Sequence, residues 1–279
     1  MAIRFYGDES EDKEAKVHAI AGFIGQASQW ELLQDEWISR VKPTGVSAYH
    51  MTDCDNGHGE FSDKEGWTKE SRTRLTIDLV EIICRYDVFL IGVGVYLDDY
   101  NSLSPVTEHG GALGHDKWHS AFQSVLREAA LRVEKCIPKG ETIAFFLDWK
   151  EKHGMADDLF GWTQCEEQLP WRDRLGTLTF GHKEFDVVGS LPLLQVADVA
   201  AVETRRSLAN LLTHSHIPER RSLARLKEAG RVALIQGLDK PYLDAVYQLK
   251  RETLGLPNTA REAEEYLRSL PRPRKPQHG

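Results

Sequence analysis

The chain is poor in cysteine, and no two of its cysteines have the C-x-x-C spacing of a metal or redox site. Nothing in the sequence resembles a secretory signal, so a fold held by disulfides is not expected. No apolar run approaches the length of a membrane-spanning helix. We therefore expect a cytoplasmic protein without membrane association, whose four cysteines are reduced: Cys54, Cys84, Cys136 and Cys165.

The chain also lacks an excess of positive charge. Its formal net charge is -8, which argues against binding nucleic acid over the whole surface and leaves open a local basic patch. Hydrophobic residues are plentiful at 41% of 279 residues. That is enough for the core of one large domain, or of a domain with an appendage.

The hydrophobic pattern alternates between strands and helices. A first strand ending near Tyr6 and a second over residues 17–25 predict an antiparallel hairpin. Strands alternating with helices indicate an α/β fold, a mixed sheet covered by helices. The later strands are expected at residues 88–97, 142–147 and 185–188, and the helices at 28–41, 75–83 and 122–133 and around Gln195 and Asp198.

After about residue 212 the composition shifts toward Arg, Lys and Leu. A basic helix from residue 217, a helix over 242–254 and a capping box at 259–262 predict a helical extension over residues 213–270. The Pro-rich, charged residues 271–279 have nothing to pack and predict a disordered tail.

Three aspartates have comparable places in this pattern. Asp8 follows the first strand, Asp148 ends a central strand, and Asp198 lies in a small, apolar helical stretch. If the first and central strands are parallel neighbours, the first two carboxylates converge at one edge of the sheet. Carboxylates gathered at one place repel, so divalent cations are the natural compensating charge, and oxygen-only ligands favour Mg²⁺ or Mn²⁺. Asp53, Asp55, Asp98 and Asp99 are alternatives to Asp148.

Three segments resemble a known family. They are Asp8-Glu9-Ser10, the His50 segment Tyr-His-Met-Thr-Asp, and Leu-Gln-x-Ala-Asp-x-x-Ala around Asp198. Together they resemble the bacterial family called domain of unknown function 3800 (DUF3800), which is similar in fold to ribonuclease H. The resemblance covers roughly residues 3–210 and implies a ribonuclease H-like domain over residues 1–212. Glu11 stands where the family often has glycine.

The resemblance implies that the acidic motifs of the family fall on Asp8, Glu9, Gln195 and Asp198. It also implies that the protein is a two-metal nuclease acting on RNA or DNA. Asp8 would bridge two ions, Asp148 and Asp198 would each hold one side, and Glu9 would bind an ion or support a ligand. Gln195 shares a helical face with Asp198, so it would orient a ligand or contact a phosphate.

Further side chains complete the expected site. His50 is a candidate proton shuttle, and Arg205, about two helical turns after Asp198, is a candidate phosphate clamp. Arg221 and Arg225, one turn apart on the basic helix, are candidates for binding a polynucleotide backbone. Two alternatives remain open: a catalytically silent binding module of the same fold, and a hydrolase of small phosphoesters, which would not need the basic helix.

Overall fold

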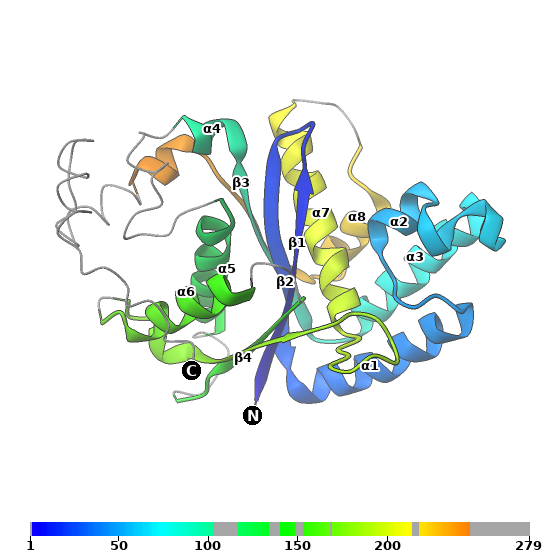
Figure 1. Ribbon diagram of the computed structural model, residues 1–279, viewed down its shortest axis with the longest axis horizontal. Helices are drawn as coiled ribbons and strands as arrows, with labels where there is room; N and C mark the ends of the chain where they lie inside the picture. Colours follow the sequence, from blue (N-terminus) through cyan, green and yellow to red (C-terminus); the bar gives the residue numbers. More distant parts are fainter. Residues whose placement is uncertain are drawn as a thin grey trace, which may run out of the picture.

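The protein forms an α/β structure around one mixed sheet (Figure 1). This computed structural model describes residues 2–102, 117–133, 140–148, 153–167, 169–213 and 218–245. Its six strands have the order β5-β4-β1-β2-β3-β6. They are β1 (Ile3–Asp12), β2 (Val17–Gln26), β3 (Val88–Tyr96), β4 (Ile143–Asp148), β5 (Leu175–Gly181) and β6 (Val232–Leu238). Pairing makes β2 antiparallel to the other strands.

Helices cover both faces of this sheet. One face carries α1 (Ala27–Val41), α2 (Met51–Asn56), α3 (Lys69–Arg85), α7 (Leu194–Leu212) and α8 (Arg221–Glu228). The other carries α5 (Lys117–Val133) and α6 (His153–Cys165), while α4 (Leu97–Asn101) continues directly from β3. Short 3-10 turns lie at Lys42–Thr44, Gly59–Phe61, Asp63–Glu65 and Arg172–Arg174. None of these described helices is long and apolar enough to cross a membrane.

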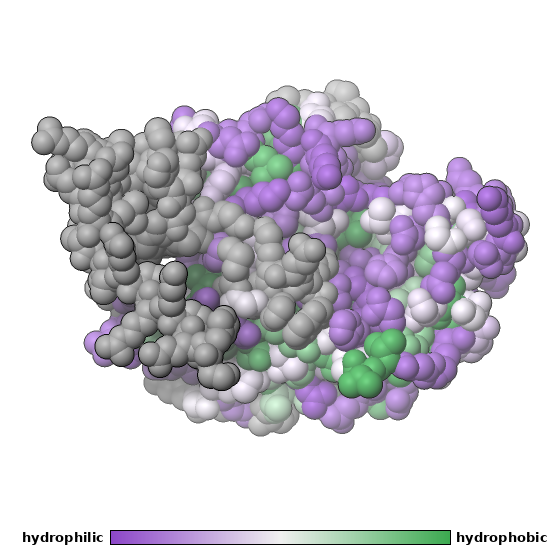
Figure 2. All heavy atoms as spheres, viewed as in Figure 1, coloured by the Kyte–Doolittle hydropathy of each residue, from purple (hydrophilic) through white to green (hydrophobic). Residues whose placement is uncertain are grey.

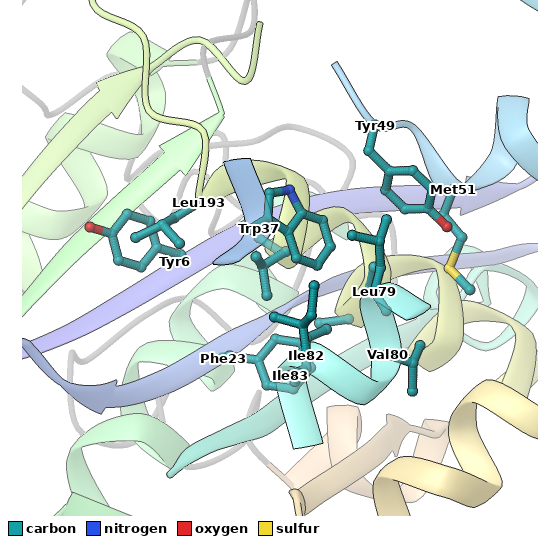
Figure 3. Close-up of a cluster of buried hydrophobic side chains, with 14 of the residues drawn as sticks. Tyr6, Phe23, Trp37, Tyr49, Met51, Leu79, Val80, Ile82, Ile83 and Leu193 are labelled. Atoms are coloured by element: carbon teal, nitrogen blue, oxygen red, sulfur yellow. The ribbon is translucent and has the colours of Figure 1, made fainter. Parts of the chain in front are cut away.

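Alternation along the strands divides the core into two layers. Phe5 of β1 packs with α5 and α6, whereas Tyr6 packs on the side of α1, α3 and α7. Figure 3 shows Phe23 of β2, Trp37 of α1 and Ile83 of α3 gathered in this second layer. Every even-numbered residue of β1 from Tyr6 onward therefore faces the layer that contains α7.

The helix α7 packs unusually close to the sheet, because β3 has glycines beneath it. A Cβ atom on Gly92 would lie 2.1 Å from Oγ1 of Thr204, and one on Gly94 would lie 2.3 Å from Cδ1 of Leu208. Any larger residue at either position would force the helix away. The close packing fixes α7, and with it Asp198, against the sheet.

The structure corrects three predictions about the elements. β1 continues to Asp12, so Asp8 lies within the strand, because the apolar β2 pairs with β1 over its whole length. Residues 185–188 form turns and bends, and the strand expected there is β5, which ends at Gly181. The region after residue 212 is not purely helical, since β6 pairs parallel with β3 and extends the main sheet. Residues 246–279, including the expected tail, lie outside the described residues.

The described surface has few large apolar side chains, and they are scattered over several elements. Examples are Leu32 on α1, Trp162 on α6 and Leu211 on α7. Figure 2 shows a face that is largely hydrophilic over α2 and α3. The described surface therefore shows no extended apolar patch, and its regions differ mainly in their charged side chains.

Candidate active site

The carboxylates of Asp8, Asp148 and Asp198 come together on the α7 side of the sheet. β1 and β4 are parallel neighbours, paired up to Gly7 and Leu147, so Asp8 and Asp148 follow this last pair side by side. The stacked rings of Tyr6 and Phe146, two residues earlier on each strand, have centroids 4.7 Å apart and mark the same face. Asp198 reaches this point from the first turns of α7.

The ammonium of Lys183 stands at the centre of these carboxylates. Its Nζ lies 2.7 Å from Oδ2 of Asp8, 3.2 Å from Oδ2 of Asp148 and 3.4 Å from Oδ1 of Asp198. The side chain of Lys183 is 6% exposed and that of Asp8 is 1% exposed. One buried cation therefore faces three carboxylates, and the four side chains leave an excess of two negative charges if all are ionised.

Backbone N–H groups hold the outward-facing oxygens of two of these carboxylates. The amide of Glu9 donates to Oδ1 of Asp8 at 2.7 Å, and the amide of Met51 donates to Oδ2 of Asp198 at 2.7 Å. These bonds fix the rotation of both carboxylates. The remaining oxygen of each points toward Lys183.

The opposite charges in this cluster stabilise each other's ionised forms, as the pKa shifts of Lys183 and Asp198 indicate. Burial alone would lower the pKa of Lys183, but the carboxylates of Asp8, Asp198 and Asp148 outweigh it and raise that pKa. Burial alone would raise the pKa of Asp198, but the ammonium of Lys183 and the contact with His50 hold it well below its usual range. At neutral pH the ammonium of Lys183 and the carboxylate of Asp198 are accordingly both charged.

His50 is the most accessible of the predicted residues at this site. It immediately precedes α2, its side chain is 35% exposed, and its Nδ1 lies 3.9 Å from Oδ1 of Asp198. The interaction with Asp198 raises the pKa of His50, against a smaller opposite effect of burial. His50 thus lies on the more exposed side of the cluster, where it can contact a bound molecule.

Gln195 is close to the site but is buried beneath it. The side chain is fully buried, accepts a hydrogen bond from Nε1 of Trp37 at 3.0 Å and donates one to the carbonyl of Lys183 at 2.7 Å. Both ends of the amide are therefore occupied within the core. Gln195 positions the backbone of Lys183, and its expected role of orienting a ligand or contacting a phosphate stays a prediction.

Two other predicted residues lie away from the three carboxylates. Strand alternation places Glu9 on the sheet face opposite Asp8. Arg205 lies seven residues after Asp198 on α7, about 10 Å along the helix. Its Nη1 is 2.8 Å from Oδ2 of Asp12, and the side chain is 10% exposed. This ion pair, rather than a phosphate, engages Arg205.

The basic helix α8 is largely paired with acidic side chains. Arg225 binds both carboxylate oxygens of Glu81, at 2.6 and 3.0 Å. Its neighbours pair likewise: Arg220 with Asp55, Lys227 with Glu219 and Arg231 with Asp87. Arg221 is exposed, and no ion-pair partner of it is found among the described residues. Among the described residues of α8, Arg221 is the one that keeps an uncompensated charge, which a polynucleotide contact would use.

The donor set suits a magnesium or manganese ion, because all three side chains offer carboxylate oxygen. Their present spacing does not, since the oxygens are arranged around an ammonium at hydrogen-bond distances of 2.7–3.4 Å. No group of three or more His, Cys, Asp or Glu side chains in the described part of the chain is already drawn together as metal ligands. The residues fit a cation in charge and chemistry, and would have to close around it.

Sequence reasoning missed Lys183. A signal existed, because residues 175–181 combine Leu, Thr and Phe in the manner of a strand and Lys183 follows two residues later. Recognising that strand would have placed the lysine beside Asp148, because Asp148 of β4 pairs with Gly181 at the end of β5. Trp37 is a fully buried core residue, and its indole N–H also donates to Gln195.

In comparisons with known proteins, no family model matches the chain, and no curated protein matches it.

Proposed function

We propose that the protein is a metal-dependent phosphodiester hydrolase, a nuclease whose site is built from Asp8, Asp148 and Asp198. One observation carries the proposal: three carboxylates from distant parts of the sequence meet around a single cationic position with two negative charges in excess. Structural ion pairs are usually balanced, whereas uncompensated buried charge is typical of functional sites.

We further propose a ribonuclease H-like fold and membership of the DUF3800 family. The six-stranded mixed sheet, with helices on both faces and the acidic residues beside two parallel strands, supports this assignment. Function does not follow from fold alone, so the argument for hydrolysis rests on the site.

The residues have separable tasks in such a reaction. Asp8, Asp148 and Asp198 would hold Mg²⁺ or Mn²⁺, which when bound lowers the pKa of a water and stabilises the leaving oxygen. The amides of Glu9 and Met51 keep two of these carboxylates oriented. His50, whose side chain is 35% exposed, can contact an oxygen of the substrate.

One observation favours a catalytically silent module of the same fold. Lys183 already compensates part of the carboxylate charge, as a cation would. The pairing of Arg225 with Glu81 also weakens the argument for a polynucleotide over a small phosphoester. Cleavage assays therefore need both kinds of substrate.

The direct test is incubation of the purified protein with labelled RNA, single-stranded DNA, duplex DNA and a chromogenic phosphodiester. Each substrate is tested with MgCl₂, MnCl₂ or EDTA. We expect cleavage of at least one polynucleotide with a divalent ion and none with EDTA. Cleavage that persists in EDTA would contradict the metal mechanism, and turnover of the chromogenic substrate alone would select the small-phosphoester hydrolase. No turnover of any substrate would favour the silent module.

A further inference from the structure

The side chain of Lys183 uses the same carboxylate oxygens that a metal ion would need. Nζ contacts Oδ2 of Asp8, Oδ2 of Asp148 and Oδ1 of Asp198. The other oxygens of Asp8 and Asp198 accept backbone N–H groups, which occupy them in bonds within the fold. The inward-facing oxygens are thus the ones available to a cation, and the ammonium holds them.

A divalent ion and this ammonium cannot contact the same three oxygens together. Magnesium binds oxygen at about 2.0–2.1 Å, and calcium at about 2.3–2.6 Å. An ion at such distances from all three oxygens would occupy the position of Nζ, which is itself only 2.7 Å from Asp8. Two cations at one point would also repel strongly.

We propose that Lys183 is a built-in competitor of the metal ion: its ammonium occupies the cation position in the metal-free protein and must withdraw before a divalent ion binds. This inference rests on the proposed function insofar as the carboxylates form a metal site. It assigns Lys183 as a positioning residue of the metal-free state, which keeps mutually repelling carboxylates together.

The packing around Lys183 confines this movement to its side chain. Nε2 of Gln195 holds the backbone carbonyl of Lys183, and Trp37 holds Gln195 from the other end. The ammonium, by contrast, is attached through a flexible four-carbon chain. The lysine can therefore leave the carboxylates by changing rotamers while its backbone stays in place.

The first test compares metal affinity in three proteins by calorimetric titration with MnCl₂. Lys183→Met, which removes the competing charge and keeps a chain of similar length, should bind Mn²⁺ at least about tenfold more tightly than wild type. Lys183→Arg, which keeps the charge, should bind no more tightly than wild type. Lys16→Met, at an exposed lysine paired with Asp98, controls for the change in net charge.

Lys183→Met leaves three buried carboxylates without a cation, so its folding needs a separate check. We expect a lower Tm than wild type without metal, and a larger rise in Tm than wild type as MnCl₂ is added. A Tm that is low and unresponsive to MnCl₂ would overturn the inference, because the site would then need the lysine even with metal present.

The wild-type protein provides a test that requires no variant. Reductive methylation with formaldehyde, read by mass spectrometry of the peptide containing Lys183, reports how accessible this amine is. We expect labelling of Lys183 to rise about tenfold or more at saturating MgCl₂, while labelling of the exposed Lys16 stays constant. Unchanged protection of Lys183 in the metal-bound protein would overturn the inference.

The outcomes separate this inference from the proposed function. If wild type and Lys183→Met bind Mn²⁺ equally well, the competition is wrong and the metal site stands. If no protein, including Lys183→Met, binds Mn²⁺ or Mg²⁺, both fail together. Binding by Lys183→Met alone would support the competition and explain a silent wild-type protein.

Discussion

Two charged regions of this molecule look alike in the sequence and differ in the structure. The acidic site gathers Asp8, Asp148 and Asp198 around one lysine, so its charge is unbalanced and buried. In the basic region around α8, most of the basic side chains pair with carboxylates, as Arg225 does with Glu81, and Arg221, which has no ion-pair partner among the described residues, is exposed. Both regions were candidates for function, and the first buries its excess charge, whereas the unpaired charge of the second, on Arg221, is exposed.

The difference shows what a charged residue in a sequence does not reveal, namely where its counter-charge lies. Glu81 is 144 residues away from Arg225 in the chain, and their pair is still partly exposed. Such pairs contribute little free energy and mark a solvated surface. A buried charge without full compensation lowers the free energy of unfolding. Such charges are therefore typical of sites where they serve a function.

The strongest way to break this comparison is to remove a charge from the acidic site. Asp198→Asn keeps the volume and an oxygen for the amide of Met51 but removes the charge that would hold an ion. We expect metal-dependent cleavage to fall about 100-fold or more, as when one transition-state stabiliser is lost. The measurement is the initial rate on the substrate found in the cleavage panel, with circular dichroism to confirm folding.

Asp78→Asn is the matched control for this variant. Asp78 lies on α3, is 40% exposed and pairs with Arg40 of α1. The same chemical change there should leave cleavage within about twofold, because an exposed ion pair contributes at most about 1 kcal/mol of stability. Full activity of Asp198→Asn would remove the acidic site from the reaction.

A second variant sharpens the comparison by loosening what holds Lys183. Gln195→Ala leaves the indole N–H of Trp37 and the carbonyl of Lys183 without their buried partner. We expect the free energy of unfolding to fall by about 1–3 kcal/mol for each unsatisfied group. Urea denaturation measures this loss.

Gln29→Ala is the control, because Gln29 of α1 makes one exposed hydrogen bond, to the amide of Asp87. Its effect should stay below about 1 kcal/mol, in the range of an ordinary hydrogen bond exposed to water. Equal losses in the two variants would mean that the buried amide of Gln195 is not the support of the site that its contacts indicate.

Much of the fold could be predicted because hydrophobic periodicity is a local property. The hairpin, the parallel β1 and β4 and the helix carrying Asp198 each show a clear apolar pattern, and these elements bring the three aspartates together. β5 and β6 were harder, since both lie at the edges of the sheet and are only partly buried. β5 interleaves Leu and Phe with Thr and Gly, and β6, although almost wholly apolar, follows a segment rich in Arg and Lys for which helices were predicted.

The centre of the site was missed because it depends on one of these edge strands. Lys183 follows an edge strand whose short pattern of Leu, Thr and Phe was overlooked, and a single lysine after an unrecognised strand carries no signal of its own. The partners of Arg205 and Arg225 depend on long-range packing, which periodicity does not encode. The sequence indicated which elements converge, while the balance of charge at the meeting point required the three-dimensional structure.

A third variant tests whether the basic region binds nucleic acid. Replacing Arg221, Arg225 and Arg231 together by alanine should change the salt dependence of binding by no more than one phosphate contact, about 0.7–0.9 in the log–log slope. The reason is that Arg225 and Arg231 already have carboxylate partners. Fluorescence anisotropy with a labelled RNA between 50 and 200 mM salt, roughly the range over which such contacts respond, measures the slope. A loss equivalent to three contacts would restore the predicted polynucleotide surface.

The smallest expected effect concerns the pair of Arg225 and Glu81. Their side chains are 41% and 44% exposed, so solvent screens the pair despite its two short hydrogen bonds. A double-mutant cycle with Arg225→Ala, Glu81→Ala and the combined variant should give a coupling free energy of about 0.2–1 kcal/mol. The coupling should shrink in 1 M NaCl, where charges are screened within about 3 Å, and should not respond to MgCl₂ at low millimolar concentration. A coupling of about 3 kcal/mol or more that survives salt would show that this pair behaves like the buried cluster around Lys183, and the contrast between the two regions would be lost.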